Sequence, residues 1–197
     1  NALTTQNSDA ANYNVAVGSS AGAAVTTGIR NTLIGALSAD SLTDADFNVA
    51  VGWAALTTDT LGSNSTAVGY RSLANQNFTT ATDTYNTAVG FQAGVNVTTG
   101  VQNTIIGGLA GDALTDADLN TAVGFNALST DTKGNHSVAI GQGALFTQNF
   151  ATSFDCNNVA VGHNAGVLST TGVDNTLIGA FAGDALTDAD DNVAIGT

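Results

Sequence analysis

A five-residue signature recurs eleven times along this chain, and every copy ends in glycine. It reads Asn or Ser, then Val or Thr, then Ala, Leu or Ile, then Val or Ile, then Gly. The terminal glycines are Gly18, Gly35, Gly52, Gly69, Gly90, Gly107, Gly124, Gly141, Gly162, Gly179 and Gly196. Three spacings of 17 residues are followed by one of 21, so that the whole pattern repeats every 72 residues. Short fixed periods of this kind are typical of stacked architectures, in which each repeat forms one rung.

Each signature predicts one short strand. The residue before the glycine is always β-branched, as at Val17 and Ile34, which favours a buried position in a sheet. Val or Thr two places earlier points to the same side, whereas the residue between them is Ala, or Leu or Ile in the second rung of each group. The glycine suits a turn with positive φ or a close backbone approach. We therefore expect an all-β parallel β-solenoid, a β-roll or β-helix, of about 17-residue rungs in 72-residue groups of four.

The remainder of each rung is also patterned. Asn opens nine of the eleven signatures, and Ser65 and Ser137 open the other two. Stacked amides hydrogen-bond along the axis of cross-β structures, and we expect the same along this stack. A small or apolar pair follows three residues after each glycine, as in Ala21-Gly22 and Ala127-Leu128. A rung is thus predicted to hold two strand-like stretches joined by polar turns such as Thr26-Thr27-Gly28.

A single stack of such rungs has little interior of its own. Each rung supplies two or three large apolar side chains at about 1.5–3 kcal/mol each, whereas ordering one residue costs about 1–2 kcal/mol of backbone entropy. Both faces of the strand are apolar, so we expect a homo-oligomer in which one face lines the rung and the other meets identical chains. Eleven rungs at about 4.8 Å each give a rod of roughly 50 Å. Residues 1–197 are interpreted as a single β-solenoid segment, cut mid-rung at both ends, of a longer fibrous protein.

Composition excludes several classes of protein. All 16 acidic residues are Asp, only three residues are basic, and the net charge is −13. This charge argues against partners made of nucleic acid and against an anionic membrane surface. The sequence also has no apolar stretch long enough for membrane insertion. Glu and Met are absent and Lys and Arg are scarce, so a helical bundle is not expected.

An acidic turn in the second rung of each group is a candidate cation site. Its end reads D-x-D-x-N, which resembles the start of a calcium loop. The candidate Ca²⁺ ligands are Asp44, Asp46, Asp116, Asp118, Asp188 and Asp190. Ala127 stands where the closing Glu of such a loop would lie, counting from Asp116. We favour a tight turn with Thr115 and Asp118 spaced as a cap, keep Ca²⁺ binding as the alternative, and expect no other cofactor.

Catalytic motifs are weak. Gly18-Ser19-Ser20-Ala21-Gly22 matches the hydrolase pattern G-x-S-x-G, but Gln92 and Asn164 take the place of Ser20 in the other groups. His136 and His163 occupy unrelated positions of the repeat, so neither a zinc site nor an acid–base pair can be assembled. We therefore predict that the chain is not an enzyme.

The longer fourth rungs carry insertions at residues 76–85 and 148–157. Exposed hydroxyls, amides and aromatic rings there offer contacts to a saccharide. The interpretation that we favour is that Phe78 and Phe150 pack against the rung and pin the loop. The single cysteine, Cys156, lies in the second insertion and leaves no intrachain disulfide to form.

The signature Asn86-Thr87-Ala88-Val89-Gly90, with turns such as Asp59-Thr60-Leu61-Gly62 and Asp131-Thr132-Lys133-Gly134, resembles repeats of tail-fibre proteins of marine and cyanobacterial phages. Ser137-Val138-Ala139-Ile140-Gly141 is also similar to the head repeat of YadA-like trimeric autotransporter adhesins, which form a β-roll of three chains. The resemblance extends over essentially the whole chain.

This resemblance implies a homotrimeric rod, in which the partners of each chain are two identical chains. It implies a structural, receptor-facing role in an extracellular tail fibre of a virion that attaches to host cells. A host receptor or saccharide would then bind mainly through regions outside this segment. The alternative is a head or stalk segment of a bacterial trimeric surface adhesin, at the bacterial cell surface. A polysaccharide-degrading tailspike and an ice-binding solenoid are less favoured alternatives.

Overall fold

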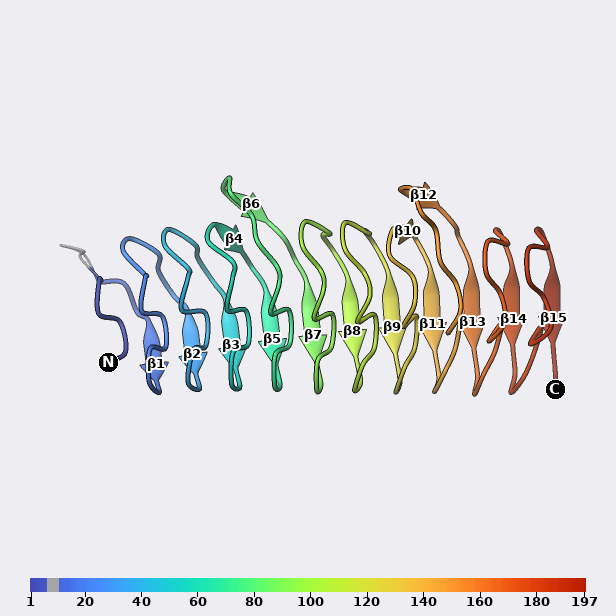
Figure 1. Cartoon of the computed structure of the whole chain (residues 1–197), viewed down its shortest axis with the longest axis horizontal. Coiled ribbons are helices and arrows are strands. Elements are labelled where there is room, and N and C mark those ends of the chain that lie inside the picture. Colours follow the sequence, from blue (N-terminus) through green and yellow to red (C-terminus); the bar gives the residue numbers. More distant parts are fainter. Residues whose placement is uncertain (7–10) are drawn as a thin grey trace.

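The computed structural model describes residues 1–6 and 11–197, and shows that part of the chain wound into a regular stack of rungs (Figure 1). Eleven three-residue strands form one sheet: β1 (Val15–Val17), β2 (Thr32–Ile34), β3 (Val49–Val51), β5 (Thr66–Val68), β7 (Thr87–Val89), β8 (Thr104–Ile106), β9 (Thr121–Val123), β11 (Val138–Ile140), β13 (Val159–Val161), β14 (Thr176–Ile178) and β15 (Val193–Ile195). Four two-residue strands form two small sheets beside it: β4 (Gly62–Ser63), β6 (Thr82–Asp83), β10 (Gly134–Asn135) and β12 (Phe154–Asp155).

Successive signatures lie directly over one another. In the large sheet all neighbouring strands are parallel, and they follow the order of the rungs from β1 to β15. The register is the same throughout; for example, Thr87 pairs with Thr104 and Ala88 with Ile105. The predicted parallel β-solenoid is therefore confirmed, with one main strand per rung.

Positive φ angles bound each strand on both sides. In the third rung, Phe47 lies before the signature with φ 59°, and Gly52 ends it with φ 136°. A Cβ atom built on Gly52 would lie only 2.3 Å from the carbonyl oxygen of Gly69 in the next rung. The glycine is thus required both by its backbone conformation and by the close approach of the neighbouring rung, as the sequence predicted.

The second predicted strand of each rung is not a strand. Leu37 and Ala39 have φ values of 58° and 46°, and two left-handed residues in three cannot form a pleat. The stretch still bonds to both neighbouring rungs, because Leu37 N donates to Ser19 O at 2.9 Å and Ala39 N donates to Ala55 O at 2.9 Å. Backbone hydrogen bonds along the stack therefore persist without strand geometry.

The asparagine stack is confirmed, although its main partners are backbone groups. The Oδ1 atom of Asn103 accepts a hydrogen bond from the backbone N–H of Asn120 at 3.0 Å. Its Nδ2 atom donates to the carbonyl oxygen of Ala117 at 2.8 Å. Asn103 is fully buried, so each of these amides satisfies backbone groups that water cannot reach. The Asn103 amide thereby joins its own signature to the next signature and to the turn that leads into it.

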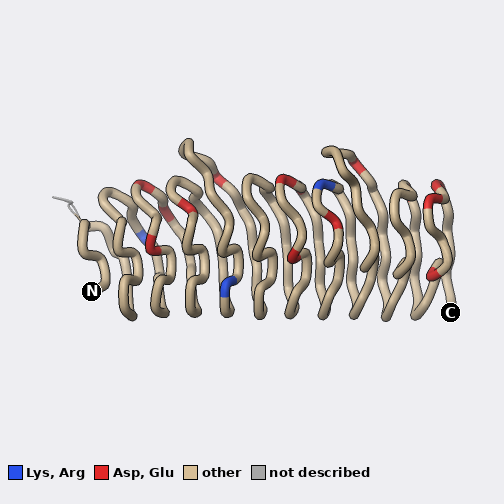
Figure 2. Tube along the Cα trace, in the orientation of Figure 1, with Lys and Arg blue, Asp and Glu red and all other residues tan. Residues whose placement is uncertain are grey.

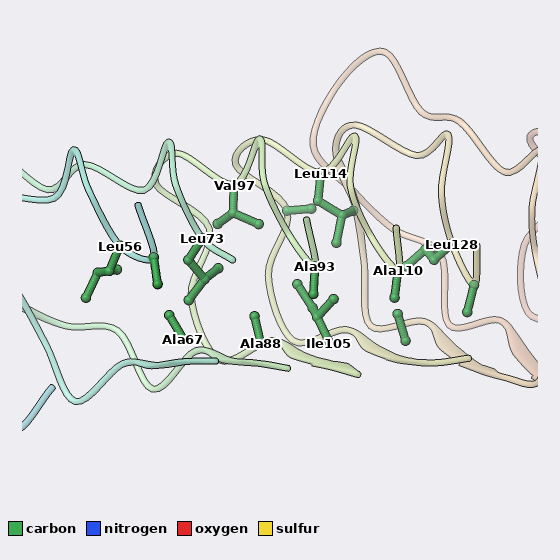
Figure 3. Close-up of a cluster of buried hydrophobic side chains, with 14 of the residues drawn as sticks. Leu56, Ala67, Leu73, Ala88, Ala93, Val97, Ile105, Ala110, Leu114 and Leu128 are labelled. Atoms are coloured by element: carbon green, nitrogen blue, oxygen red, sulfur yellow. The ribbon is translucent and has the colours of Figure 1, made fainter. Parts of the chain in front are cut away.

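In the core, a large side chain on one side of the rod faces a small residue on the other (Figure 3). The two sides are the strands of the large sheet and the left-handed stretches opposite them. Where the strand contributes Ile105, the wall across from it carries Gly94, and a Cβ atom there would lie 2.9 Å from Ile105 Cδ1. Where the strand contributes Ala67, the same rung carries the buried Leu73. This alternation explains why the second rung of each group has Leu or Ile in the middle of its signature, where the other rungs have Ala.

The residue before each glycine points outward, not into the core. Ala122 in the middle of β9 is fully buried, whereas Val123 beside it is half-buried and faces outward. The prediction of a buried Val or Ile is therefore wrong for the single chain, because the narrow interior admits mainly alanine from the strand. The described residues contain no helix with the length and apolarity needed to cross a bilayer.

Candidate functional site

The outer face of the large sheet, called the outer sheet face below, is the candidate interaction surface that extends furthest along the rod. We define it as the outward side chains of the eleven strands of the large sheet, which form two columns along the rod. One column consists of Val15, Thr32, Val49, Thr66, Thr87, Thr104, Thr121, Val138, Val159, Thr176 and Val193. The other consists of Val17, Ile34, Val51, Val68, Val89, Ile106, Val123, Ile140, Val161, Ile178 and Ile195. Every member is Val, Ile or Thr, so the outer sheet face is apolar or weakly polar throughout.

An aromatic column borders this face. Trp53, Tyr70 and Phe91 each follow directly after a strand-terminal glycine, and each is about half exposed. Their rings stack, with centroids 5.1 Å apart for Trp53 and Tyr70 and 5.2 Å apart for Tyr70 and Phe91. Because the ring faces contact one another, the ring edges are left to meet a partner.

Among the described residues, the carboxylates lie outside the strands of the large sheet, on turns or, for Asp83 and Asp155, in the two small sheets (Figure 2). Three of the candidate Ca²⁺ ligands bind the backbone of the preceding rung. Asp46 Oδ1 accepts from Ile29 N at 2.8 Å, and Asp118 Oδ1 accepts from Val101 N at 2.7 Å. Asp190 Oδ1 accepts from Val173 N at 2.9 Å. These carboxylates hold neighbouring rungs together.

The other three candidate ligands have separate contacts. Asp44 Oδ1 accepts from the hydroxyl of Thr27 at 2.5 Å. Asp116 Oδ2 lies 3.6 Å from Lys133 Nζ, and Asp188 accepts from the hydroxyl of the threonine before it. Within the described part of the chain, no three His, Cys or Asp side chains gather into a group that could hold a metal ion. The acidic turns are therefore explained by contacts within and between rungs, and Ca²⁺ binding stays an untested alternative.

The residues of the weak catalytic motifs are far apart. Ser20 belongs to the first rung and His163 to the ninth, so about 38 Å of stacked rungs separates them. His163 contacts Phe181 edge to face, with ring centroids 5.0 Å apart. His136 Nδ1 lies 3.1 Å from Asp155 Oδ1. The structure thus does not bring the candidate nucleophile and the two histidines together.

The first insertion contains a buried polar network that the sequence interpretation missed. Asp59 is fully buried, and its Oδ1 atom accepts from the backbone N–H groups of Gly62 at 3.1 Å and Phe78 at 3.0 Å. Its Oδ2 atom accepts from Gln76 Nε2 at 2.5 Å. The carboxylate therefore joins the turn at Gly62 in the preceding rung to the start of the insertion at Phe78.

Gln76 occupies the place where the asparagine stack is interrupted. Its Nε2 atom also donates to the hydroxyl of Ser65 at 2.8 Å, and its Oε1 atom accepts from Asn86 Nδ2 at 2.9 Å. Gln76 was expected on an exposed loop, but it is fully buried because Ser65 is shorter than the usual Asn and leaves room for it. The coincidence of Ser at the head of the signature with Gln eleven residues later was the available sequence signal.

The second insertion repeats this network. Gln148 Nε2 donates to Asp131 Oδ2 at 2.6 Å and to the Ser137 hydroxyl at 3.0 Å. Cys156 takes the place that Thr84 has in the first insertion. Burial raises the pKa of the Cys156 thiol to about 12, and the negative charge of Asp131 adds to that shift. This thiol is therefore protonated at neutral pH and unsuited to nucleophilic chemistry.

The two phenylalanines of the insertions behave differently. Phe78 is 7% exposed, so the prediction that it packs against the rung is confirmed. Phe150 is half-buried and stacks on Phe154, with ring centroids 5.7 Å apart and an interplanar angle of 7°. The second insertion therefore carries a paired aromatic surface at its outer end.

Comparisons with known proteins identify no relative of this chain. No protein-family model, no curated protein and no solved structure matches it. The outer sheet face and the two insertions are accordingly the features from which a function can be inferred.

Proposed function

We propose that this chain is a structural, receptor-facing rod segment of a trimeric phage tail fibre that takes part in host-cell attachment. The observation that carries the proposal is the outer sheet face, in which two columns of Val, Ile and Thr run unbroken along eleven strands and stay partly exposed. Continuous apolar surfaces of this extent mark sites of protein–protein association.

The partners of the outer sheet face are further copies of the same chain. None of the described carboxylates lies in a strand of the large sheet, so identical chains can bring their sheet faces together without placing those carboxylates against one another. A second copy also carries β-branched side chains at the same rise per rung, which allows the two surfaces to interdigitate along their length. The number of three chains comes from the resemblance of the signature to tail-fibre and adhesin repeats.

The stack is suited to a mechanical role. Backbone hydrogen bonds and abutting glycines join each rung to the next, and asparagine side chains add to these contacts except where Ser65 and Ser137 interrupt the asparagine stack. Contacts confined to neighbouring rungs produce an extended, quasi-one-dimensional body instead of a globule. Such a rod holds a distal binding region at a fixed distance from its attachment point.

A bacterial surface adhesin is the second candidate. The two insertions rise from the flank of the rod (Figure 1), and in an adhesin the flank itself is the binding surface. The complete reading frame distinguishes the two: a membrane anchor downstream favours the adhesin. A virion-attachment region upstream, or a chaperone domain downstream that is released after trimerisation, favours the fibre.

Sedimentation equilibrium tests the association. The wild-type chain is expected to have the mass of three chains, and Val123→Asp is expected to reduce it to one chain by placing a charge on the outer sheet face. Thr79→Asp, which adds the same charge on the exposed first insertion, is the matched control and is expected to leave the mass unchanged. A wild-type chain that stays monomeric at every concentration tested would refute the trimer.

A further inference from the structure

Two further columns of side chains border the outer sheet face. The leading border is the residue directly before each signature, and the trailing border is the residue directly after each terminal glycine. The leading border consists of Tyr13, Arg30, Phe47, Asn64, Tyr85, Gln102, Leu119, His136, Asn157, Asp174 and Asp191. The trailing border consists of Ser19, Ala36, Trp53, Tyr70, Phe91, Gly108, Phe125, Gln142, His163, Ala180 and Thr197. Each rung thus has one residue of each border, at opposite ends of the same strand.

The exposed large apolar side chains gather on the outer sheet face and on its two borders. On the leading border they are Tyr13, Phe47, Tyr85 and Leu119, and on the trailing border they are Trp53, Tyr70, Phe91 and Phe125. Elsewhere in the part of the chain that the structure describes, only Phe154, Leu168 and Phe181 are large, apolar and exposed. The apolar surface therefore continues from the strands onto both borders, as expected of an association surface.

The leading border carries bulky side chains that its backbone does not favour. All of its residues have positive φ, including Tyr85 at 52° and Leu119 at 60°. Asn and Asp tolerate this conformation best among residues with a side chain, and they occupy it at Asn64 and Asp174. The single chain therefore gives no reason for an exposed Tyr or Leu at these positions, whereas a partner that covers them does.

Copies that associate about an axis along the rod bring unlike borders together. A rotation about such an axis leaves the height of every rung unchanged and turns each copy relative to the next. The leading border of one copy then lies beside the trailing border of its neighbour, at the same rung. This holds for two copies as well as for three.

The two borders match in chemistry when they meet at the same rung. Four rungs have a large exposed apolar residue on the leading border, and in three of them the trailing residue is an exposed aromatic ring. The three pairs are Phe47 with Trp53, Tyr85 with Phe91, and Leu119 with Phe125. The acidic Asp174 and Asp191 meet Ala180 and Thr197, so these carboxylates do not meet other charges of the borders. Rings that pack on apolar side chains in this way stabilise association.

Other arrangements lose part of this match. A slip of one rung sets Tyr85 against Gly108 in one direction, and it sets Leu119 against Gly108 in the other. An antiparallel pair places each border against itself in reverse order. With all eleven rungs overlapped, Phe47 then faces Asn157.

We infer that copies of this chain associate parallel and in register, with the leading border of each copy packed on the trailing border of the next. This inference deepens the proposed association and rests on it, because it names the direction, the register and the contacts of the partner chains. It also places the insertions of all copies at the same height along the rod.

Cysteine cross-linking tests the arrangement in a Cys156→Thr background. A His136→Cys, Gln142→Cys variant carries one thiol on each border of the same rung, and both positions are exposed. Mild oxidation is expected to join different copies into covalent oligomers, which a denaturing gel without reductant separates by mass. Each single variant is expected to stay at the mass of one chain, because like borders do not meet. A disulfide within one chain leaves the mass unchanged and is not mistaken for association.

A His136→Cys, His163→Cys variant is the matched control for register. Its thiols lie on opposite borders but one rung apart, about 4.8 Å along the axis, so it is expected to form covalent oligomers about tenfold more slowly. Equal rates for the two double variants would overturn the register. Covalent dimers of a single variant would show an antiparallel arrangement and overturn the inference.

Sedimentation equilibrium of the same variants separates this inference from the proposed function. Oligomers that sediment together but form no covalent link between positions 136 and 142 would overturn the border contact alone. Variants and wild type that all sediment as single chains would refute the association itself, and the inference with it.

A second pair of variants tests the apolar contact. Leu119→Ser removes a 44% exposed side chain of the leading border and is expected to weaken association about tenfold or more. Leu168→Ser removes a 50% exposed leucine outside both borders and is expected to leave association unchanged. Circular dichroism should show the same fold for both variants. Equal effects of the two changes on association would overturn the role given to the leading border.

Discussion

The Cα atom of Gly124 abuts the carbonyl group of Gly141 in the next rung, so closely that a Cβ atom on Gly124 would lie 2.5 Å from that oxygen. The φ angle of Gly124 is +137°, which L-residues with a side chain rarely adopt. The same contact recurs from rung to rung, from Gly18 against Gly35 to Gly179 against Gly196. The glycine column therefore fixes how closely the rungs stack.

Replacing Gly124 with Ala should destabilise the stack by at least about 1–3 kcal/mol from backbone strain, with the clash against Gly141 in addition. Gly108→Ala is the matched control, since Gly108 lacks positive φ and its nearest contact would be Phe125 Cδ2 at an ordinary 3.5 Å. Denaturant unfolding measures both variants. Equal midpoints for the two would contradict the role given to the glycine column.

The pairing of large with small core residues predicts that two neighbouring residues of one strand, Ile105 and Ile106, differ sharply in their contribution to stability. Ile105→Ala leaves a cavity opposite Gly94 and should cost about 2–5 kcal/mol of unfolding free energy. Ile106→Ala changes the next residue of β8, which is 39% exposed, and should cost far less in the monomer. Thermal unfolding at a concentration that keeps the chain monomeric distinguishes them. A larger loss for Ile106→Ala would mean that the strand faces are reversed.

The buried network of the first insertion predicts that replacing Gln76 costs more stability than replacing its neighbour Asn77. Gln76→Leu removes the side-chain partner of Asp59 Oδ2 and one of the two acceptors of Asn86 Nδ2, at about 1–3 kcal/mol for a neutral group left unpaired and more for the carboxylate. Asn77→Ala affects an exposed side chain and should change stability by no more than about 0.5 kcal/mol. If urea unfolding reports no difference between them, Gln76 does not have the buried role described.

Cys156 predicts a stability change at alkaline pH. Burial raises its pKa from 9.0 to about 12, so the folded chain holds the thiol proton more tightly than the unfolded chain does. The resulting stabilisation is complete below pH 9.0 and is lost as the pH rises towards about 12. Over that range the wild type should lose more unfolding free energy than Cys156→Thr, which carries the residue of the first insertion. Parallel pH profiles would contradict this assignment.

The same burial should protect the thiol from chemical modification. A water-soluble thiol reagent is expected to react slowly with the native chain and fast in denaturant, because it needs an exposed thiolate. Rapid labelling of the native chain would show that the second insertion opens more readily than its hydrogen bonds indicate.

Much of the fold was predictable because the repeat constrains it at every rung. A glycine at the end of each signature, with β-branched residues before it, indicated a strand and a close approach, and Gly52 over Gly69 shows both. The asparagine stack was predictable for the same reason. Its bonding to backbone groups was not, since an amide can pair with another amide or with a peptide group, and only the geometry of Asn103 decides between them.

Three features could not be read from the sequence. The faces of the strand both look apolar, and only the narrowness of the interior decides that Ala122 points inward and Val123 outward. Leu56 and Leu73 adopt left-handed backbone conformations that leucine does not favour by itself, because the bonds between rungs impose them. Gln76 lies in a polar stretch that resembles a surface loop, and its burial depends on the space beside Ser65.

The stacking of signature on signature is tested most directly by cross-linking paired positions in a Cys156→Thr background. Thr87 and Thr104 pair across β7 and β8, about 4.8 Å apart, so a Thr87→Cys, Thr104→Cys variant should be joined within one chain by a short bifunctional thiol reagent. Thr87→Cys, Thr121→Cys spans two rungs, about 9.6 Å, and should not be joined by the same reagent. Efficient closure of the first pair alone is the predicted result. Equal closure of both pairs, or closure of neither, would contradict the solenoid.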